Sequence, residues 1–213
     1  MRFIQKCSYS FANKITISLN ENHQKRSIYY YGFQIIIGAF VKGVILVSLA
    51  FVLGVLLPTL FITAAFASLR KLAGGYHMDT YGKCILVSLG LFLAAALIVQ
   101  HTYTCWSIIN IAALIGITFI MGLYVLIRYA PKDTPNKPII DPKEIRKFKS
   151  LSTVYIFLWA VVVTVLTIFG YKMIVLCLCS GVLLELFVIS PIGHKFFDII
   201  KYKLDKKKKV KVK

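Results

Sequence analysis

A histidine and a cysteine with the chemistry of a catalytic pair lie seven residues apart in a short polar segment, residues 70–84. A thiol becomes a nucleophile at neutral pH when a base or a cation increases its thiolate fraction, and histidine is the usual partner. His77 and Cys84 supply that pair. The expected chemistry is attack of a thiolate on a carbonyl carbon. On residue type alone, the competing interpretation of Cys84 is an inert, small, apolar side chain.

The spacing of this pair sets a condition on the backbone. On one straight helix, residues seven apart share a face but are separated by about 10 Å along the axis, which is too far for a hydrogen bond. The chain must therefore bend between them. Gly74, Gly75 and Gly82 permit such a bend because glycine adopts backbone angles that other residues avoid.

Cys84 directly precedes an apolar run, residues 85–100, so we expect it in the first turn of a membrane helix. Unpaired amide groups and the positive end of the helix dipole would favour a thiolate there, and the same amides could receive an oxyanion. The sequence does not identify a third group that orients the imidazole. Asp79 is two residues from His77, but an ordinary loop carboxylate is the simpler interpretation.

Other polar residues offer weaker alternatives. His101 and Cys105 have helical spacing, but their connector contains neither glycine nor a charged residue. Glu185 lies within the last apolar segment, where an ionisable group is costly and often functional; pairing inside the helix bundle, or a position near the interface, is the competing account. Cys177 and Cys179 would project to different faces of a helix, so we expect no joint metal site there.

The elements that would position these residues are membrane helices. Apolar residues make up 58% of the 213 residues, against about 45–50% in soluble domains. Four segments approach the length of about 20 residues that a spanning helix needs: residues 85–100, 108–127, 153–169 and 173–189. A longer apolar stretch, residues 28–69, has room for two crossings, or for one crossing and a re-entrant helix. The predicted fold is an all-α, polytopic transmembrane bundle of about six segments, one or two of which have a re-entrant or interfacial alternative.

The charge distribution predicts the orientation of this bundle. Lys and Arg number 26 against 8 Asp and Glu, a formal net charge of +18. These cations gather in four places between apolar runs: residues 1–26, 70–83, 128–149 and the tail after residue 194. Because basic loops favour the cytoplasmic side and anionic lipid, we expect both termini and both long connectors there, and no nucleic-acid partner. We expect one domain, residues 1–213, with a basic N-terminal segment (1–27) and a Lys-rich tail (201–213).

Two motifs resemble one known family. The pattern Arg70-x-x-Ala73-Gly74-Gly75-Tyr76-His77, followed by Cys84, is similar to the signature of the accessory gene regulator B (AgrB) family. The segment Ala-Pro-Lys-Asp-Thr-Pro-Asn-Lys-Pro-Ile, residues 130–139, resembles the proline-rich cytoplasmic loop of that family. With the length and the hydrophobic layout, the resemblance covers most of the chain and is weakest in the N-terminal stretch and the Lys-rich tail.

The resemblance implies a bacterial multi-pass cell-membrane cysteine endopeptidase with His77 as the base, Cys84 as the nucleophile and the active site on the cytoplasmic side. Its substrate would be a short amphipathic propeptide of the AgrD type, cut through an acyl-enzyme thioester and cyclised to a thiolactone or lactone for quorum sensing. The resemblance implies a homodimer and no metal or organic cofactor.

Arg70 and Gly75 match family motif positions as well. Two roles stay open for Arg70, whose planar guanidinium suits a substrate carboxylate but also an anchor at the membrane edge. For Gly75 we expect a conformational role rather than a chemical one.

Two rival functions come from other classes. Six apolar segments and an intramembrane Glu185 are ordinary in a small transporter or channel. Such proteins carry internal symmetry and polar residues along several helices, whereas polarity here is concentrated in one Gly-rich connector. The second rival is a membrane scaffold without catalytic activity. This hypothesis predicts that capping of the thiol has no effect on precursor processing.

Overall fold

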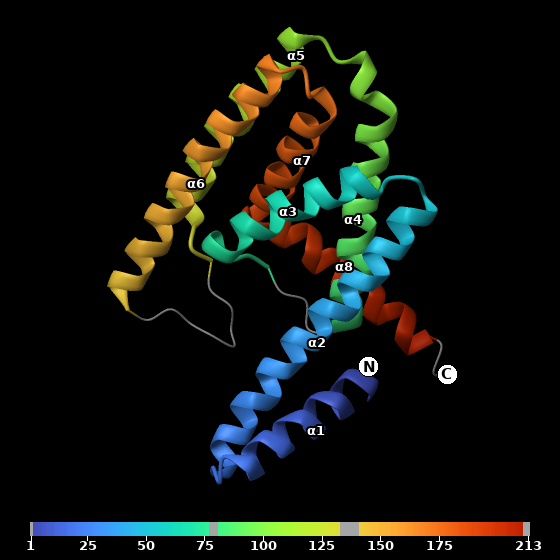
Figure 1. Cartoon of the computed structure of the whole chain (residues 1–213), viewed down its shortest axis with the longest axis vertical. Coiled ribbons are helices and arrows are strands. Elements are labelled where there is room, and N and C mark those ends of the chain that lie inside the picture. The colour runs from blue at the N-terminus through green and yellow to red at the C-terminus, as the bar shows by residue number, and fades with distance from the viewer. Residues whose placement is uncertain (1, 77–80, 133–140, 211–213) are drawn as a thin grey trace.

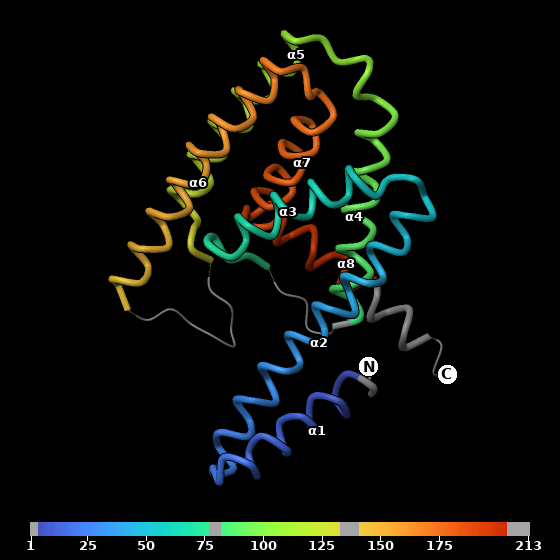
Figure 2. Tube along the Cα trace, viewed as in Figure 1, coloured from blue at the N-terminus to red at the C-terminus, as the bar shows by residue number. Residues whose placement is uncertain are grey.

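The computed structural model describes residues 2–76, 81–132 and 141–210, and within these ranges the chain forms eight α-helices and one 3-10 helix (Figures 1 and 2). The described residues contain no β-strand, which confirms the predicted all-α fold. The elements in chain order are α1 (Arg2–Ser18), α2 (His23–Val52), α3 (Leu56–Ala73), α4 (Tyr81–Thr102), η1 (Tyr103–Cys105), α5 (Ile108–Tyr129), α6 (Pro142–Ile168), α7 (Lys172–Ile189) and α8 (Pro191–Val210).

Six of the described helices, α2 to α7, are long and apolar enough to cross a membrane. This confirms the predicted number of segments and makes the chain a multi-pass membrane protein. The ambiguous stretch, residues 28–69, forms two of these helices, α2 and α3, which are joined by a turn at Gly54. Lys42 lies within α2 and does not interrupt it. Pro58 lies in the first turn of α3, where the missing N–H of proline is tolerated.

Helix α7 is the centre of the bundle. It contacts α3, α4, α5, α6 and α8 (Figure 1). In its apolar window 56% of the residues are buried, against 17–33% in the other five candidate spans. The other helices therefore keep wide apolar faces for lipid, while α7 carries the side chains that several helices share.

The two ends of the chain fold against the bundle in different ways. Helix α1 lies beside α2 (Figure 1), and aromatic pairs join them, with Tyr9 edge-on to Tyr30 and Phe11 beside Phe33. Helix α8 begins at Pro191, directly after the end of α7, and packs on it. The predicted basic N-terminal segment is thus helical over most of its length, and α8 extends into the predicted Lys-rich tail.

Candidate functional site

Cys84 lies in the first turn of α4, as predicted, and its thiol is free and half-buried. Helix α3 ends at Ala73 and residues 74–76 are not helical, so Arg70 and Cys84 lie on different helices. The bend required between His77 and Cys84 involves residues 77–80, which lie outside the described residues, so it stays a prediction. His77 and Asp79 lie outside the described residues. Their predicted roles as base and as orienting group, and that of Cys84 as nucleophile, therefore stay predictions.

The start of the proline-rich loop lies against the end of α3. The Lys132 amide donates a hydrogen bond of 2.8 Å to the Ala73 carbonyl oxygen, and Gly74 and Lys132 form a parallel bridge. Gly74 has a φ of +75°, and a Cβ placed on it would overlap the Lys132 carbonyl oxygen. Only glycine fits this close approach without movement of the backbone. The two motifs that carry the family resemblance are therefore in direct contact.

Arg70 joins three parts of the structure. Its guanidinium Nη1 lies 3.4 Å from a carboxylate oxygen of Glu185 on α7, and Nη2 donates a 2.6 Å hydrogen bond to the Tyr76 carbonyl oxygen. The guanidinium carbon is also 5.6 Å from the centre of the Phe66 ring. Of the alternatives for Glu185, pairing inside the bundle is the one observed. The sequence did not suggest a carboxylate of the protein itself as the partner of Arg70.

Gly75 lies under the Arg70 guanidinium. Its φ is +144°, a conformation that L side chains rarely adopt, and an added Cβ would lie 2.6 Å from Nη1 of Arg70 and 3.2 Å from a methyl carbon of Val188. A side chain at position 75 would therefore displace the guanidinium from its partners. The structure thus gives both a conformational and a packing reason for glycine here.

Helix α8 covers the residue that precedes His77. The Tyr76 ring stacks on Phe197 at 5.3 Å and meets the His194 ring edge-on at 5.1 Å, while its hydroxyl donates a 2.7 Å hydrogen bond to Asp198. Burial lowers the pKa of the His194 imidazole, the Lys132 ammonium lowers it further, and Asp198 opposes both. The beginning of α8 therefore packs directly against the residue before His77.

Lys42 places a positive charge near the thiol from inside α2. Its ammonium lies 5.6 Å from the centre of the Phe92 ring on α4 and interacts electrostatically with Cys84 and Arg70. Within the part of the chain that the structure describes, Lys42 makes no ion pair. The sequence analysis treated Lys42 only as an interruption of an apolar stretch. The signal for more was its position, because ionisable residues inside membrane spans are rare and often functional.

Replacing Lys42 with methionine is expected to slow alkylation of Cys84 at neutral pH. The reason is Coulombic, because the ammonium interacts electrostatically with Cys84 and an interaction of about 1 kcal/mol corresponds to about a fivefold change in rate. The measurement is the rate of N-ethylmaleimide labelling of Cys84 in a variant without the other four cysteines. Lys42→Arg should keep the rate, and so should Lys147→Met, which removes an exposed lysine of α6. Equal rates in wild type and Lys42→Met would contradict an electrostatic role.

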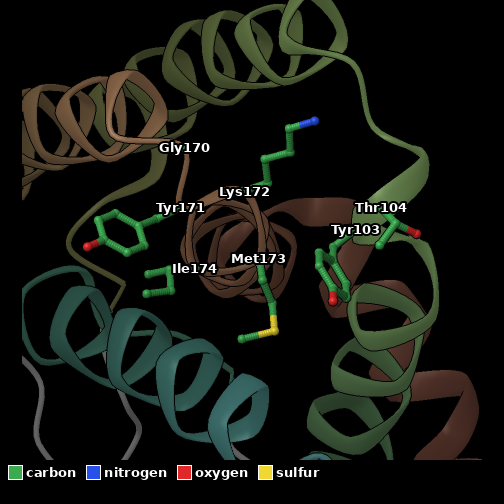
Figure 3. Close-up of a pocket in the computed structure, with 7 residues that line it drawn as sticks. All are labelled: Tyr103, Thr104, Gly170, Tyr171, Lys172, Met173 and Ile174. Carbon is green, nitrogen blue, oxygen red and sulfur yellow. The ribbon is translucent and has the colours of Figure 1, made fainter.

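The second histidine–cysteine pair lies at the opposite end of α4. His101 and Cys105 are both exposed, and the chain changes from α-helix to 3-10 helix between them. This end also holds a cavity of about 460 Å³, whose lining residues are shown in Figure 3. Lys172 in its lining donates a hydrogen bond of 3.0 Å to the Trp106 carbonyl. Because α4 has 22 residues, it places this cavity about 30 Å from Cys84, so the cavity is not part of the same site.

Comparison with known proteins identifies the family. The sequence model described as "Accessory gene regulator B" matches residues 8–211. An AgrB-like protein of Clostridium perfringens is 24% identical, over 90% of this chain and 93% of its own. Accessory gene regulator protein B of Staphylococcus aureus is 25% identical, over 78% and 83%, and that of Staphylococcus lugdunensis 26%, over 90% and 96%. No solved structure matches this chain. The chain belongs to the accessory gene regulator B family.

Proposed function

We propose that this chain is a membrane-embedded cysteine endopeptidase in which Cys84 is the nucleophile and His77 is the base. The observation that supports this most is the setting of Cys84. It is a free, half-buried thiol in the first turn of a membrane helix, and the Lys42 ammonium interacts with it electrostatically. A helix N-terminus and a nearby cation are both features that activate a thiol.

The proposed first half-reaction cuts the propeptide on the C-terminal side of the future ring. The His77 imidazole accepts the Cys84 proton, and the sulfur attacks the carbonyl carbon of the scissile peptide bond. The oxygen that becomes negative accepts hydrogen bonds from the unpaired amides of the first turn of α4. Collapse of this intermediate breaks the C–N bond, the imidazolium gives its proton to the leaving amine, and the acyl group stays on Cys84 as a thioester.

The second half-reaction closes the ring. A cysteine thiol or serine hydroxyl inside the propeptide attacks the thioester carbonyl and loses its proton to His77. The C–S bond to Cys84 breaks, the thiol is reprotonated, and a thiolactone or lactone leaves. Since the thioester keeps the acyl group reactive, no ATP is required.

The proposed substrate is an amphipathic AgrD-like propeptide that lies on the inner leaflet and reaches the site by lateral diffusion. The basic connectors, which we place on the cytoplasmic side with both termini, would suit an acidic stretch in that peptide. We propose a homodimer as the assembly, on family grounds alone. A charge-reversed propeptide tests the electrostatic part, since unchanged processing at low salt would contradict it.

Thiol capping tests whether this chain does chemistry at all. A variant in which Cys84 is the one remaining cysteine is reconstituted in vesicles, treated with N-ethylmaleimide, and mixed with a synthetic AgrD-like propeptide. We expect capping to remove cleavage. Propeptide added before the reagent should protect Cys84 from labelling and so preserve activity. Cleavage that is unaffected by complete capping of Cys84 would contradict the proposed function and favour a scaffold or transporter.

A further inference from the structure

We propose that Glu185 is a positioning residue, which acts through Arg70 to hold the backbone that leads into His77. The inference rests on the proposed function and adds to it a residue on α7, 115 positions from Arg70 in the sequence. Helices α3 and α7 pack side by side, so a carboxylate on one reaches a guanidinium on the other (Figure 1).

Glu185 is placed where a carboxylate is tolerated only with a partner. Its side chain is fully buried in the central helix of the bundle, next to the buried Leu186. One carboxylate oxygen faces Arg70, and the other has no hydrogen-bond partner among the described residues. Taking a carboxylate out of water is costly unless it is paired. The pairing with Arg70 is therefore the interaction that makes Glu185 acceptable in α7.

Arg70 in turn fixes a point of the backbone next to the proposed base. Its two terminal nitrogens are divided between Glu185 and the Tyr76 carbonyl oxygen, so the guanidinium links α7 to the residue directly before His77. The absence of a side chain at Gly75 leaves the space that the guanidinium occupies. Glu185, Arg70 and Tyr76 thus form one continuous link from a buried helix to the catalytic segment.

The link depends on the Glu185 carboxyl group as the acceptor that holds the Arg70 guanidinium. Arg70 is long and flexible, and Lys42 interacts with it as a like charge. Without the carboxylate, the guanidinium is drawn toward water at the membrane surface. Long basic side chains near helix ends commonly extend toward water in this way. The Tyr76 carbonyl then loses the hydrogen bond from Arg70. Since productive geometry at a reacting centre is sensitive to shifts of about 1 Å, the catalytic rate falls more than substrate binding.

The first arm of the test is kinetic. Glu185→Gln, Arg70→Gln and the double variant are compared with wild type for cleavage of the propeptide in vesicles. We expect Glu185→Gln to lower kcat about 10- to 100-fold with KM nearly unchanged, and the double variant to match Arg70→Gln. Glu144→Gln makes the same chemical change on the exposed start of α6 and should retain activity. Losses that add in the double variant, or wild-type kcat in Glu185→Gln, would overturn the proposal.

The second arm does not depend on activity. Hydrogen–deuterium exchange of the peptide that covers residues 70–76 should become faster in Glu185→Gln, with no further increase in the double variant, while peptides of α5 keep their wild-type rates. Unchanged exchange across residues 70–76 would overturn the link. If wild type fails to cleave while exchange responds as expected, the endopeptidase proposal fails and the link stands, so the two failures are distinguishable.

Discussion

Replacement of Cys84 by alanine is expected to abolish propeptide cleavage and to leave the helix bundle intact. The thiol lies half-buried in the first turn of α4, so its loss removes the proposed nucleophile but little packing. Removal of a nucleophile typically lowers the catalytic rate by at least about a thousandfold. Co-expression with the propeptide in a membrane host, followed by mass spectrometry of the fragments, measures the effect. Cys84→Ser should be inactive too, because a hydroxyl ionises far less readily than a thiol.

The chain offers a matched control for this experiment. Cys105 is a free and exposed cysteine at the opposite end of α4, so Cys105→Ala removes a thiol without touching the proposed site. We expect it to process propeptide at the wild-type rate. The reverse pattern, with loss in Cys105→Ala and activity in Cys84→Ala, would move the chemistry to the His101 and Cys105 pair.

The second large effect is expected from Gly74→Ala. The new Cβ would overlap the Lys132 carbonyl oxygen, and the φ of +75° is unfavourable for alanine by about 1–3 kcal/mol. The bridge between the end of α3 and the start of the proline-rich loop must therefore open, which shifts the chain three residues before His77. We expect propeptide cleavage to fall about 10- to 100-fold. The assay is the same vesicle reaction, normalised to the amount of folded protein.

Two other glycines separate the causes of this effect. Gly170 also has a positive φ, +80°, but no atom lies within 4 Å of an added Cβ, so Gly170→Ala tests strain alone. Gly90 is in α4 with open space and ordinary helix geometry, so Gly90→Ala tests the added methyl group alone. Both variants should keep near-wild-type cleavage. Equal losses in Gly170→Ala and Gly74→Ala would show that general destabilisation, rather than the contact with Lys132, lowers activity.

The fold was largely predictable because each membrane helix can be recognised from the hydropathy of its own segment, without knowledge of its neighbours. A segment long enough to cross the bilayer must satisfy its backbone internally, so apolar length alone predicts a helix. The ambiguous stretch, residues 28–69, was also limited by charge, since an even number of crossings there places the basic connectors on one side. The observed pair α2 and α3 fits that expectation.

The arrangement around the site was less predictable because it depends on pairing between distant helices. Arg70 matched a motif, and Glu185 was noted as an isolated charge, but nothing in the spacing of one predicts contact with the other. The same holds for Tyr76 and α8, where a helix begun by Pro191 brings Phe197 onto the ring. Such contacts depend on which helices are neighbours in the bundle, and the periodicity of the sequence does not reveal that arrangement.

Direct detection of the acyl-enzyme tests the central claim most closely. Wild-type protein in vesicles is mixed with a propeptide in which the ring-closing cysteine is replaced by alanine, so that the thioester has no internal acceptor, and the intact protein is weighed by mass spectrometry. We predict an added mass equal to the N-terminal propeptide fragment, located on Cys84, released by hydroxylamine and absent from Cys84→Ala. Cleavage without any adduct on Cys84, or an adduct that persists in Cys84→Ala, would contradict a thioester mechanism at this residue.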